Sequence, residues 1–285
     1  LEARSSSSVF WILPLVDQLI TLYPKDVNLR LSKASLLRQL VDRSTFLEYL
    51  EAQAHAPAAH ALFKLRYAQA LLEDGRRREE ATRLLRTLLR SWTSAEGLST
   101  LADAYWYAGE YRRATDLYRF AATLDGTNED YASAYFRASR TVRDEAGVLT
   151  FLHGRVRRYG QQSSLPAITL FHCLSDLNRS SEAFIVRDQA LAQRPDDGEL
   201  LLFAARSELD RGAMAASELF LERAQQCSKR ADWLRATAQL EESKGHLGEA
   251  RRLWTEVVAS EPFNLRAQRT LVRLTSEVDG RIAAV

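Results

Sequence analysis

The chain contains only two cysteines in 285 residues, Cys173 and Cys227, and they lie far apart in the sequence. That spacing excludes the CxxC motifs of redox and zinc sites and gives no disulfide framework. Because a free cysteine behaves as a small hydrophobic side chain, we expect both thiols to be buried. Neither a metal site nor a bound cofactor is predicted.

Glycine and proline are also scarce, with 12 and 6 residues, which is too few for a β-rich or disordered chain. Of the 39 basic residues only five are lysines, and this arginine bias is typical of a GC-rich bacterial coding sequence. The net charge of +2 gives no general attraction to nucleic acid or to an anionic membrane, so neither is expected as a partner. Hydrophobic residues make up 46% of the chain, which is ample for a core.

Catalytic motifs are absent as well. There is no GxxxxGK[ST] loop, no GxGxxG after a strand and no GxSxG elbow. His172 is adjacent to Cys173, but neighbouring residues on a helix point about 100° apart and do not face each other. The carboxylates Glu79–Glu80 and Glu241–Glu242 are interpreted as solvated helix faces. No enzyme active site is predicted. The histidines, none of which lies in an HExxH motif, are His55, His60, His153, His172 and His246.

The N-terminal region carries no recognisable secretory signal, because LEARSSSS lacks a basic region followed by an apolar run and a cleavage site. The apolar stretch Val9–Tyr23 is interrupted by Pro14 and Asp17 and is shorter than the roughly 20 residues of a spanning helix. We therefore expect no membrane insertion of this chain. Ser5–Ser8 is interpreted as a flexible leader or a helix cap, and the missing initiator Met suggests a fragment of a longer protein.

Residues 95–128 set the pattern for the rest of the chain. They predict two helices, Gly97–Ala108 and Tyr111–Leu124, with a turn at Gly109. This stretch resembles the tetratricopeptide repeat, a 34-residue helix–turn–helix unit with the pattern W-x2-L-G-x2-Y, then A-x3-F, then P. Here a small residue and a tyrosine stand at Ala102 and Tyr105, Ala114 and Tyr118 form the A-x3-F pair, and Gly126 replaces the closing proline.

The same frame extends in both directions from residue 95. The poorest unit is 129–163, where Phe136, Val148 and Arg155 replace small residues, while Gly280 is expected to open a turn near the end of the chain. The alternative is an irregular helical bundle, which the regular spacing of Pro24, Pro195 and Pro262 argues against. The predicted division is a half-unit at 9–26, units at 27–61, 62–94, 95–128, 129–163, 164–197, 198–230 and 231–264, and a partial unit at 265–285.

The resemblance implies an all-α fold, a right-handed superhelical α-solenoid that occupies residues 1–285 as a single domain. Two antiparallel helices approach closely only where side chains are small, so Ala102, Ala114 and Ala121 are expected at the crossings. No unit can bury its apolar face alone, and stability then comes from stacking on neighbouring units. The chain is expected to begin and end within a longer array.

In the family, the first helix of each unit lines the concave groove that binds partners. Carried over by position, the pattern gives a recurring arginine together with two exposed aromatic side chains. A guanidinium recognises carboxylates with two hydrogen bonds, and aromatic side chains supply rigid contact area. The predicted partner-binding residues are Arg66, Asp103, Trp106, Tyr107, Arg137, Arg140, His172, Arg206 and Arg235, accompanied by Glu73, Asp176, Asp210 and Glu242.

The resemblance implies a non-catalytic scaffold that recruits or positions another protein, through an acidic or mixed-charge segment or an enzyme of the same pathway. Large bacterial proteins with such arrays include periplasmic parts of exopolysaccharide export machines, which favours the bacterial periplasm over the cytoplasm. The alternatives are a ligand-sensing regulatory module and a groove that binds an anionic polymer. Charged side chains are common on helix surfaces, however, and a plain solvated surface also accounts for the arginines.

Overall fold

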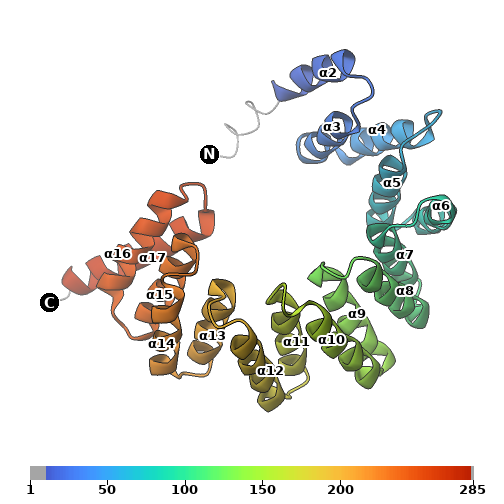
Figure 1. Cartoon of the computed structure of the whole chain (residues 1–285). Coiled ribbons are helices and arrows are strands. Elements are labelled where there is room, and N and C mark those ends of the chain that lie inside the picture. Colours follow the sequence, from blue (N-terminus) through green and yellow to red (C-terminus); the bar gives the residue numbers. More distant parts are fainter. Residues whose placement is uncertain (1–10, 284–285) are drawn as a thin grey trace. The chain divides into compact units, whose positions relative to one another are not determined.

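The computed structural model describes residues 11–283, with side chains described up to residue 280. Within that range the chain forms sixteen helices, labelled α2 to α17, and no strand (Figure 1). The predicted leader Ser5–Ser8 lies outside the described residues. The chain divides into two compact units, Leu1–Glu145 and Ala146–Val285, which are called unit 1 and unit 2 below. The division falls within the predicted poor unit 129–163.

The helices of each unit follow one another along the chain. Unit 1 contains α2 (Ile12–Leu22), α3 (Val27–Leu40), α4 (Arg43–His55), α5 (Ala61–Asp74), α6 (Arg78–Ser91), α7 (Ala95–Tyr107), α8 (Tyr111–Leu124) and α9 (Glu129–Val142). Unit 2 contains α10 (Glu145–Tyr159), α11 (Leu165–Asp176), α12 (Ser180–Gln193), α13 (Gly198–Asp210), α14 (Met214–Ala224), α15 (Arg230–Ser243), α16 (Leu247–Ser260) and α17 (Leu265–Ala283). We call the odd-numbered helices first helices and the even-numbered ones second helices.

Neighbouring helices pack as pairs, most extensively α7 with α8 in unit 1 and α13 with α14 in unit 2. The predicted helices and the turn at Gly109 are confirmed, since α7 ends at Tyr107 and α8 begins at Tyr111. Gly109 has φ of +79°, a left-handed conformation that glycine adopts without steric cost. One such residue follows the end of each first helix from α5 to α15, at intervals of 33 to 35 residues. These residues are Gly75, Gly109, Arg143, Asn178, Gly212 and Gly245.

Small side chains lie at the helix crossings, as predicted for Ala102, Ala114 and Ala121, which are completely buried. The fourth residue of most second helices repeats this pattern. It is Ala81 in α6, Ala114 in α8, Ala183 in α12 and Ala250 in α16, each completely buried, with Val148 in α10 and Ser217 in α14. A small side chain at this position lets the two helices of a pair approach, and leucines fill the space on either side.

Unit 2 also buries an ion pair that the sequence pattern did not reveal. Arg187 of α12 lies 2.7 Å from the carboxylate of Glu208 in α13, and both side chains are about 95% buried. The same guanidinium donates a hydrogen bond of 2.9 Å to the Ser207 hydroxyl and lies over the ring of Phe184. A buried charge needs such partners because water no longer solvates it. The pair therefore ties α12 to α13.

Two sequence predictions were wrong. Gly280 does not open a turn but lies inside α17, which continues to Ala283. A glycine costs a helix only about 1 kcal/mol, and the other contacts of α17 exceed that cost. Cys227 is exposed, although Cys173 is buried as expected. Cys227 lies in the loop between α14 and α15, where its thiol donates to the Arg223 carbonyl oxygen. Among the described residues, no helix is long and apolar enough to cross a membrane.

Candidate binding grooves

The first helices of unit 1 line a groove of about 790 Å³, called the first groove, between α3, α4, α5 and α7. Three of the predicted partner-binding residues lie in it, namely Arg66, Asp103 and Tyr107. Glu73 of α5, which the sequence pattern placed on the groove side, lies there as well. Arg38 of α3 also lines the groove, although the sequence pattern did not single it out. The first groove therefore collects side chains from three successive first helices.

Cations in the first groove are held by carboxylates of the next first helix. Arg38 lies 2.8 Å from Glu73, and Arg66 forms an ion pair with Glu96. Gln69 accepts a hydrogen bond of 2.8 Å from Arg66 and donates one of 3.1 Å to Glu96. These pairs link α3 to α5 and α5 to α7, so both arginines already have anionic partners within the protein.

Asp103 of α7 accepts a hydrogen bond from the hydroxyl of Tyr118 in α8. Partial removal from water raises the pKa of Asp103, an effect that the Tyr118 hydroxyl and the charge of Arg137 oppose. Burial and the neighbouring carboxylate together raise the pKa of Tyr118. Tyr118 thus keeps its proton and holds the Asp103 side chain in place at the edge of the first groove.

The predicted aromatic residues take different positions. Trp106 is half-buried, and its ring packs edge-on against Tyr111 with the centroids 4.8 Å apart. Tyr107 is exposed and faces the guanidinium of Arg78 at 4.5 Å. Trp106 does not line the first groove, whereas Tyr107 does. On α9, Arg137 and Arg140 are exposed, and Arg140 lies 5.9 Å above the Phe136 ring.

Unit 2 has a larger groove of about 1040 Å³, called the second groove. The loop before α11 and the N-terminal turns of α13, α15 and α17 line it. Arg206 and Arg235 of the predicted residues lie in this groove. His172 is exposed outside its lining, with its ring 5.3 Å from that of Phe203, which does line the groove.

A close approach of the backbone builds one wall of the second groove. A Cβ atom at Gly198, the first residue of α13, would lie 2.3 Å from the carbonyl oxygen of Cys227. Since no side chain fits there, glycine lets the start of α13 lie against the loop before α15. The Asp197 side chain caps α13 by accepting from the backbone N–H of Leu200 at 3.0 Å. The N-terminal turns of two first helices are thereby brought together.

Some cations of the second groove are paired. Arg235 forms ion pairs with Asp232 and, at 2.8 Å, with Glu261, while Arg194 lies 2.6 Å from Asp197. Burial pushes the pKa of Asp197 upward, but the Leu200 N–H and Arg194 outweigh this effect and hold the pKa below its ordinary value.

Three other cations of the second groove are exposed. Within the part of the chain whose side chains the structure describes, they make no ion pair or side-chain hydrogen bond. We call Arg206, Lys229 and Arg266 the three free cations. The carboxylate of Glu199 is the only unpaired acidic group among the described lining residues. The N-terminal ends of α13, α15 and α17 add partial positive charge beside these side chains. The second groove therefore presents an excess of unpaired positive charge.

Lys229, Arg266 and Phe203 were missed by the sequence analysis. The family pattern assigns the groove to fixed positions within the first helix, whereas Lys229 is the N-cap of α15 and Arg266 lies in the first turn of α17. A sequence signal was present, because both cations stand at the start of a predicted first helix. Their convergence on one groove depends on how the helices stack.

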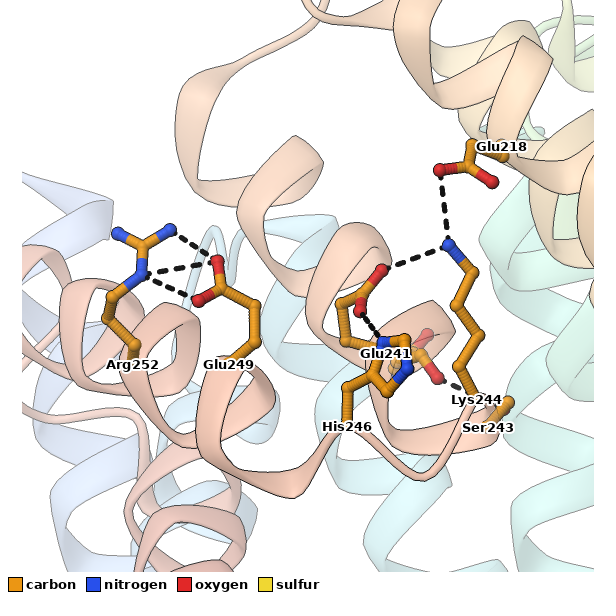
Figure 2. A network of polar contacts seen from close by, with 8 residues as sticks. Glu218, Glu241, Ser243, Lys244, His246, Glu249 and Arg252 are labelled. Atoms are coloured by element: carbon orange, nitrogen blue, oxygen red, sulfur yellow. Dashed lines mark hydrogen bonds and ion pairs between the residues drawn. The ribbon is translucent and has the colours of Figure 1, made fainter.

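The paired carboxylates Glu241–Glu242, predicted to be solvated, are instead partly buried and hold helices together. Figure 2 shows Lys244 between Glu218 of α14 and Glu241 of α15, at 3.1 Å from each, with His246 on the other oxygen of Glu241 at 2.8 Å. Partial burial pushes the pKa of Glu241 upward, but the hydrogen bonds from His246 and Lys244 outweigh it and hold the pKa below its ordinary value.

Glu242 accepts a hydrogen bond of 2.6 Å from the indole N–H of Trp254 in α16 and pairs with Arg273 of α17. Glu80 is likewise not simply solvated, since it pairs with Arg77 at 2.8 Å. For Glu241 and Glu242 the prediction was wrong because a carboxylate on a first helix can reach polar groups beyond its own helix. Glu80 lies on the second helix α6 and pairs with Arg77, the N-cap of that same helix. Among the described residues, no three His, Cys, Asp or Glu side chains are grouped so that they could hold a metal ion.

Comparison with known proteins supports the fold. No protein family matches the sequence, and no curated protein matches it. Yeast Tom70 superposes with a TM-score of 0.59 at 15% identity, over 98% of this chain and 61% of the Tom70 chain. A tetratricopeptide repeat protein from Parabacteroides merdae gives a TM-score of 0.48 at 14% identity, covering 86% of this chain and 97% of that one.

The helix pairs, their periodic turns and the similarity to Tom70 identify an all-α fold of the tetratricopeptide type. The identities are too low to carry over a partner or an activity. The predicted partner-binding residues and the single continuous array stay predictions.

Proposed function

We propose that this chain is a protein-interaction scaffold, in which the second groove of unit 2 holds an acidic segment of a partner protein. The observation that carries the proposal is that the three free cations line one groove, with Lys229 at the start of α15 and Arg266 at the start of α17. A carboxylate placed there would gain charge-assisted hydrogen bonds and the favourable end of the helix dipoles. Tetratricopeptide-type folds are commonly scaffolds, which supports the coarser part of the proposal.

The apolar part of the second groove suits a peptide more than a free anion. Phe203 and Leu202 of α13 line it beside the cations, together with Trp254 of α16. Aromatic and arginine side chains are the residues that most often dominate the energetics of protein interfaces. We therefore expect the bound segment to combine carboxylates with at least one apolar side chain.

The test is a fluorescence anisotropy titration of the full chain with a labelled 12-residue peptide of alternating Glu and Leu, flanked by Ser. The triple variant Arg206→Glu, Lys229→Glu and Arg266→Glu should weaken binding by at least tenfold, and moderate salt should weaken binding to the unaltered chain. A control triple with the same change of charge at exposed, unpaired cations of unit 1 should keep the affinity. Its substitutions are Lys25→Glu, Arg76→Glu and Arg112→Glu.

Equal loss in both triples would mean that the peptide responds to net charge alone, and the proposal would fail. The polymer alternative is tested in parallel with alginate as an anionic polysaccharide. Stronger binding of alginate than of the peptide, abolished by the same groove triple, would replace a peptide groove with a polymer groove.

The proposal for the cellular assembly and compartment in which this scaffold acts rests only on the family resemblance and the arginine bias. In that setting the scaffold would position a partner enzyme within a bacterial envelope assembly such as an exopolysaccharide export machine, in the periplasm. A ligand-sensing regulatory module is the competing role. Co-purification from a bacterial host with a chromosomal tag would decide between them, since an envelope assembly would bring down export proteins and a regulator would not.

A further inference from the structure

A separate pocket lies on the other side of unit 1, where the second helices α6 and α8 flank α7. Its volume is about 510 Å³, within the range of roughly 300–1,000 Å³ typical of ligand pockets. It shares no lining residue with the first groove, although different residues of α7 line both sites. We call it the second-helix pocket.

Apolar side chains from three helices form the floor of this pocket. They are Leu89 of α6, Leu98, Leu101 and Tyr105 of α7, and Leu117 of α8. Leu101 is buried and the other four side chains are half-buried, so none of the five is fully exposed and the pocket is a shallow apolar surface. A shallow apolar surface suits contact with a bulky side chain of a partner.

Close packing of α6 against α7 fixes the position of the floor. A Cβ atom at Gly97 would lie 2.9 Å from the Cδ2 atom of Leu89, so the glycine lets the end of α6 approach the start of α7. The Ser94 hydroxyl caps α7 by accepting from the Gly97 N–H at 3.0 Å. The floor is therefore held by regular helical backbone, a rigid support for a binding site.

The rim of the pocket is basic. Arg86 and Arg90 of α6 and Arg113 of α8 line it, with Asp116 as the only acidic group among the described lining residues. Arg86 and Arg90 are exposed and, within the described side chains, make no ion pair or side-chain hydrogen bond. Arg113 is partly engaged, since it pairs with Glu110 and lies 5.8 Å from the ring of Tyr105.

The position of the arginines has a partly structural explanation. Cations near the C-terminus of a helix interact favourably with its dipole, and Arg90 lies in the last turn of α6. This effect favours one such cation, but it does not explain why Arg86 and Arg90 meet Arg113 of another helix around an apolar floor. Charge complementarity assigns that arrangement to an anionic ligand with an apolar anchor.

We propose that the second-helix pocket docks a short segment of a partner protein, in which a bulky apolar side chain is flanked by carboxylates. The apolar side chain enters between Leu98 and Leu117, and the carboxylates pair with Arg86 and Arg90. A membrane surface fits less well, because none of the five apolar side chains of the floor is exposed. The site is independent of the second groove, so one chain could hold two segments at once.

The experiment uses the full chain with Arg206→Glu, Lys229→Glu and Arg266→Glu, which removes the second groove as a competing site, and a fluorescein-labelled peptide with the core Glu-Glu-Leu-Phe-Glu-Glu between Gly-Ser flanks. The double variant Arg86→Glu and Arg90→Glu should weaken binding by tenfold or more. The opposite change at the rim, Asp116→Lys, should strengthen binding about two- to fivefold. A circular dichroism melt of each variant checks that the fold is kept, as expected for exposed positions.

The matched control is Lys25→Glu with Arg76→Glu, two exposed cations outside the pocket that make no ion pair among the described side chains, which alters the net charge by the same amount. It should leave binding of this peptide within twofold. Because the second groove already carries the triple substitution, the binding that remains tests the second-helix pocket separately from the proposal for the second groove. A control peptide with Ser in place of Leu and Phe should bind at least tenfold more weakly.

Three results would overturn the proposal. One is equal affinity for the peptide without its apolar residues, which would reduce the site to general electrostatics. Another is an unchanged affinity in the Arg86→Glu, Arg90→Glu double variant. The third is binding to phosphatidylserine vesicles that the same double variant abolishes while the peptide does not compete, which would assign the pocket to a lipid surface.

Discussion

The two grooves are built from the same kind of helix pair but treat their cations differently. In the first groove, arginines of α3 and α5 are paired with carboxylates of the following first helix. In the second groove, the three free cations face the opening without a partner. The difference shows that arginines at similar positions in a repeat array can have two roles. Where a carboxylate of the next first helix pairs with the arginine, the arginine connects repeats. Where the carboxylates of the next first helix pair with other cations, as Asp232 does with Arg235, an arginine such as Arg206 stays available to a ligand.

The largest expected effect concerns the support of the second groove. Replacing Arg187 by Met leaves the Glu208 carboxylate buried without its main partner, which should lower the free energy of unfolding by about 3–5 kcal/mol. Urea denaturation followed by circular dichroism measures the loss. The first groove supplies the control, since Arg38→Met breaks a pair whose side chains are 63% and 48% exposed and should cost about 0–1 kcal/mol.

A double variant, Arg187→Met with Glu208→Leu, should recover much of the stability lost in the single variant, because no unpaired charge then remains buried. If Arg187→Met costs no more than Arg38→Met, the ion pair does not support α12 and α13 in the way described.

The next largest effect is expected at the helix crossings, where we ask whether the stability of both units depends equally on small residues. Ala114→Leu in α8 and Ala250→Leu in α16 each place extra atoms at a completely buried position. Each should cost about 1–3 kcal/mol through overpacking. Thermal melts would measure the losses, and Ala213→Leu, outside a helix and only partly buried, serves as a control. An unchanged melting temperature in Ala114→Leu would argue against the repeat register.

A smaller effect would convert the first groove into one that resembles the second. Glu73→Gln and Glu96→Gln remove the carboxylates that hold Arg38 and Arg66. The freed guanidinium groups should then strengthen binding of the acidic Glu–Leu peptide about three- to tenfold, as seen by anisotropy in a chain whose second groove carries the triple substitution. Gln at both positions keeps the shape of the side chains. If the affinity does not rise, pairing is not what distinguishes the grooves.

The smallest effect is in the pH dependence of stability. The folded-state pKa of Glu241 is lowered, so its contribution is present above the unfolded pKa and is lost as the pH falls through the folded value. Asp103 has a raised pKa, so protonation favours the folded chain as the pH falls. Glu241→Gln should therefore make the loss of stability shallower between roughly pH 5 and pH 3, and Asp103→Asn should make it steeper between roughly pH 6 and pH 4.

Urea midpoints at several pH values would measure both slopes, each expected to change stability by roughly 0.2–1 kcal/mol. Glu199→Gln, at an exposed carboxylate of the second groove that lacks an ion pair among the described side chains, is the control and should follow the unaltered chain. Slopes of the same sign in the two variants would contradict the assignment.

The repeat frame was readable from the sequence because it depends on residue size at fixed intervals. Ala114 and Ala250 have the same place in their helices, and a glycine such as Gly109 or Gly245 follows the first helix of the pair. The repeat was harder to recognise at residues 129–163, because there Arg143 takes the left-handed conformation that glycine takes in other units. A turn with an uncommon residue leaves no composition signal.

Part of the candidate site was also predictable. Position in the repeat assigned all the partner-binding residues to one concave groove. In the structure Arg66, Asp103 and Tyr107 line the first groove, while Arg206 and Arg235 line the second. That these residues bind a partner stays a prediction. Their state of pairing was not predictable. Whether Arg66 forms an ion pair within the protein depends on Glu96, thirty residues away in the sequence, and on how far α5 lies from α7.

By itself, the sequence determined the helices, the turns between them and the small residues at which they cross, since these depend on local backbone preference and on side-chain volume. Only the tertiary structure decided which cations have partners and which remain free. Charges interact over a few ångströms between residues far apart in the chain, and that distance is set by stacking. The same reason hid the buried pair of Arg187 with Glu208, whose side chains meet only where α12 packs against α13.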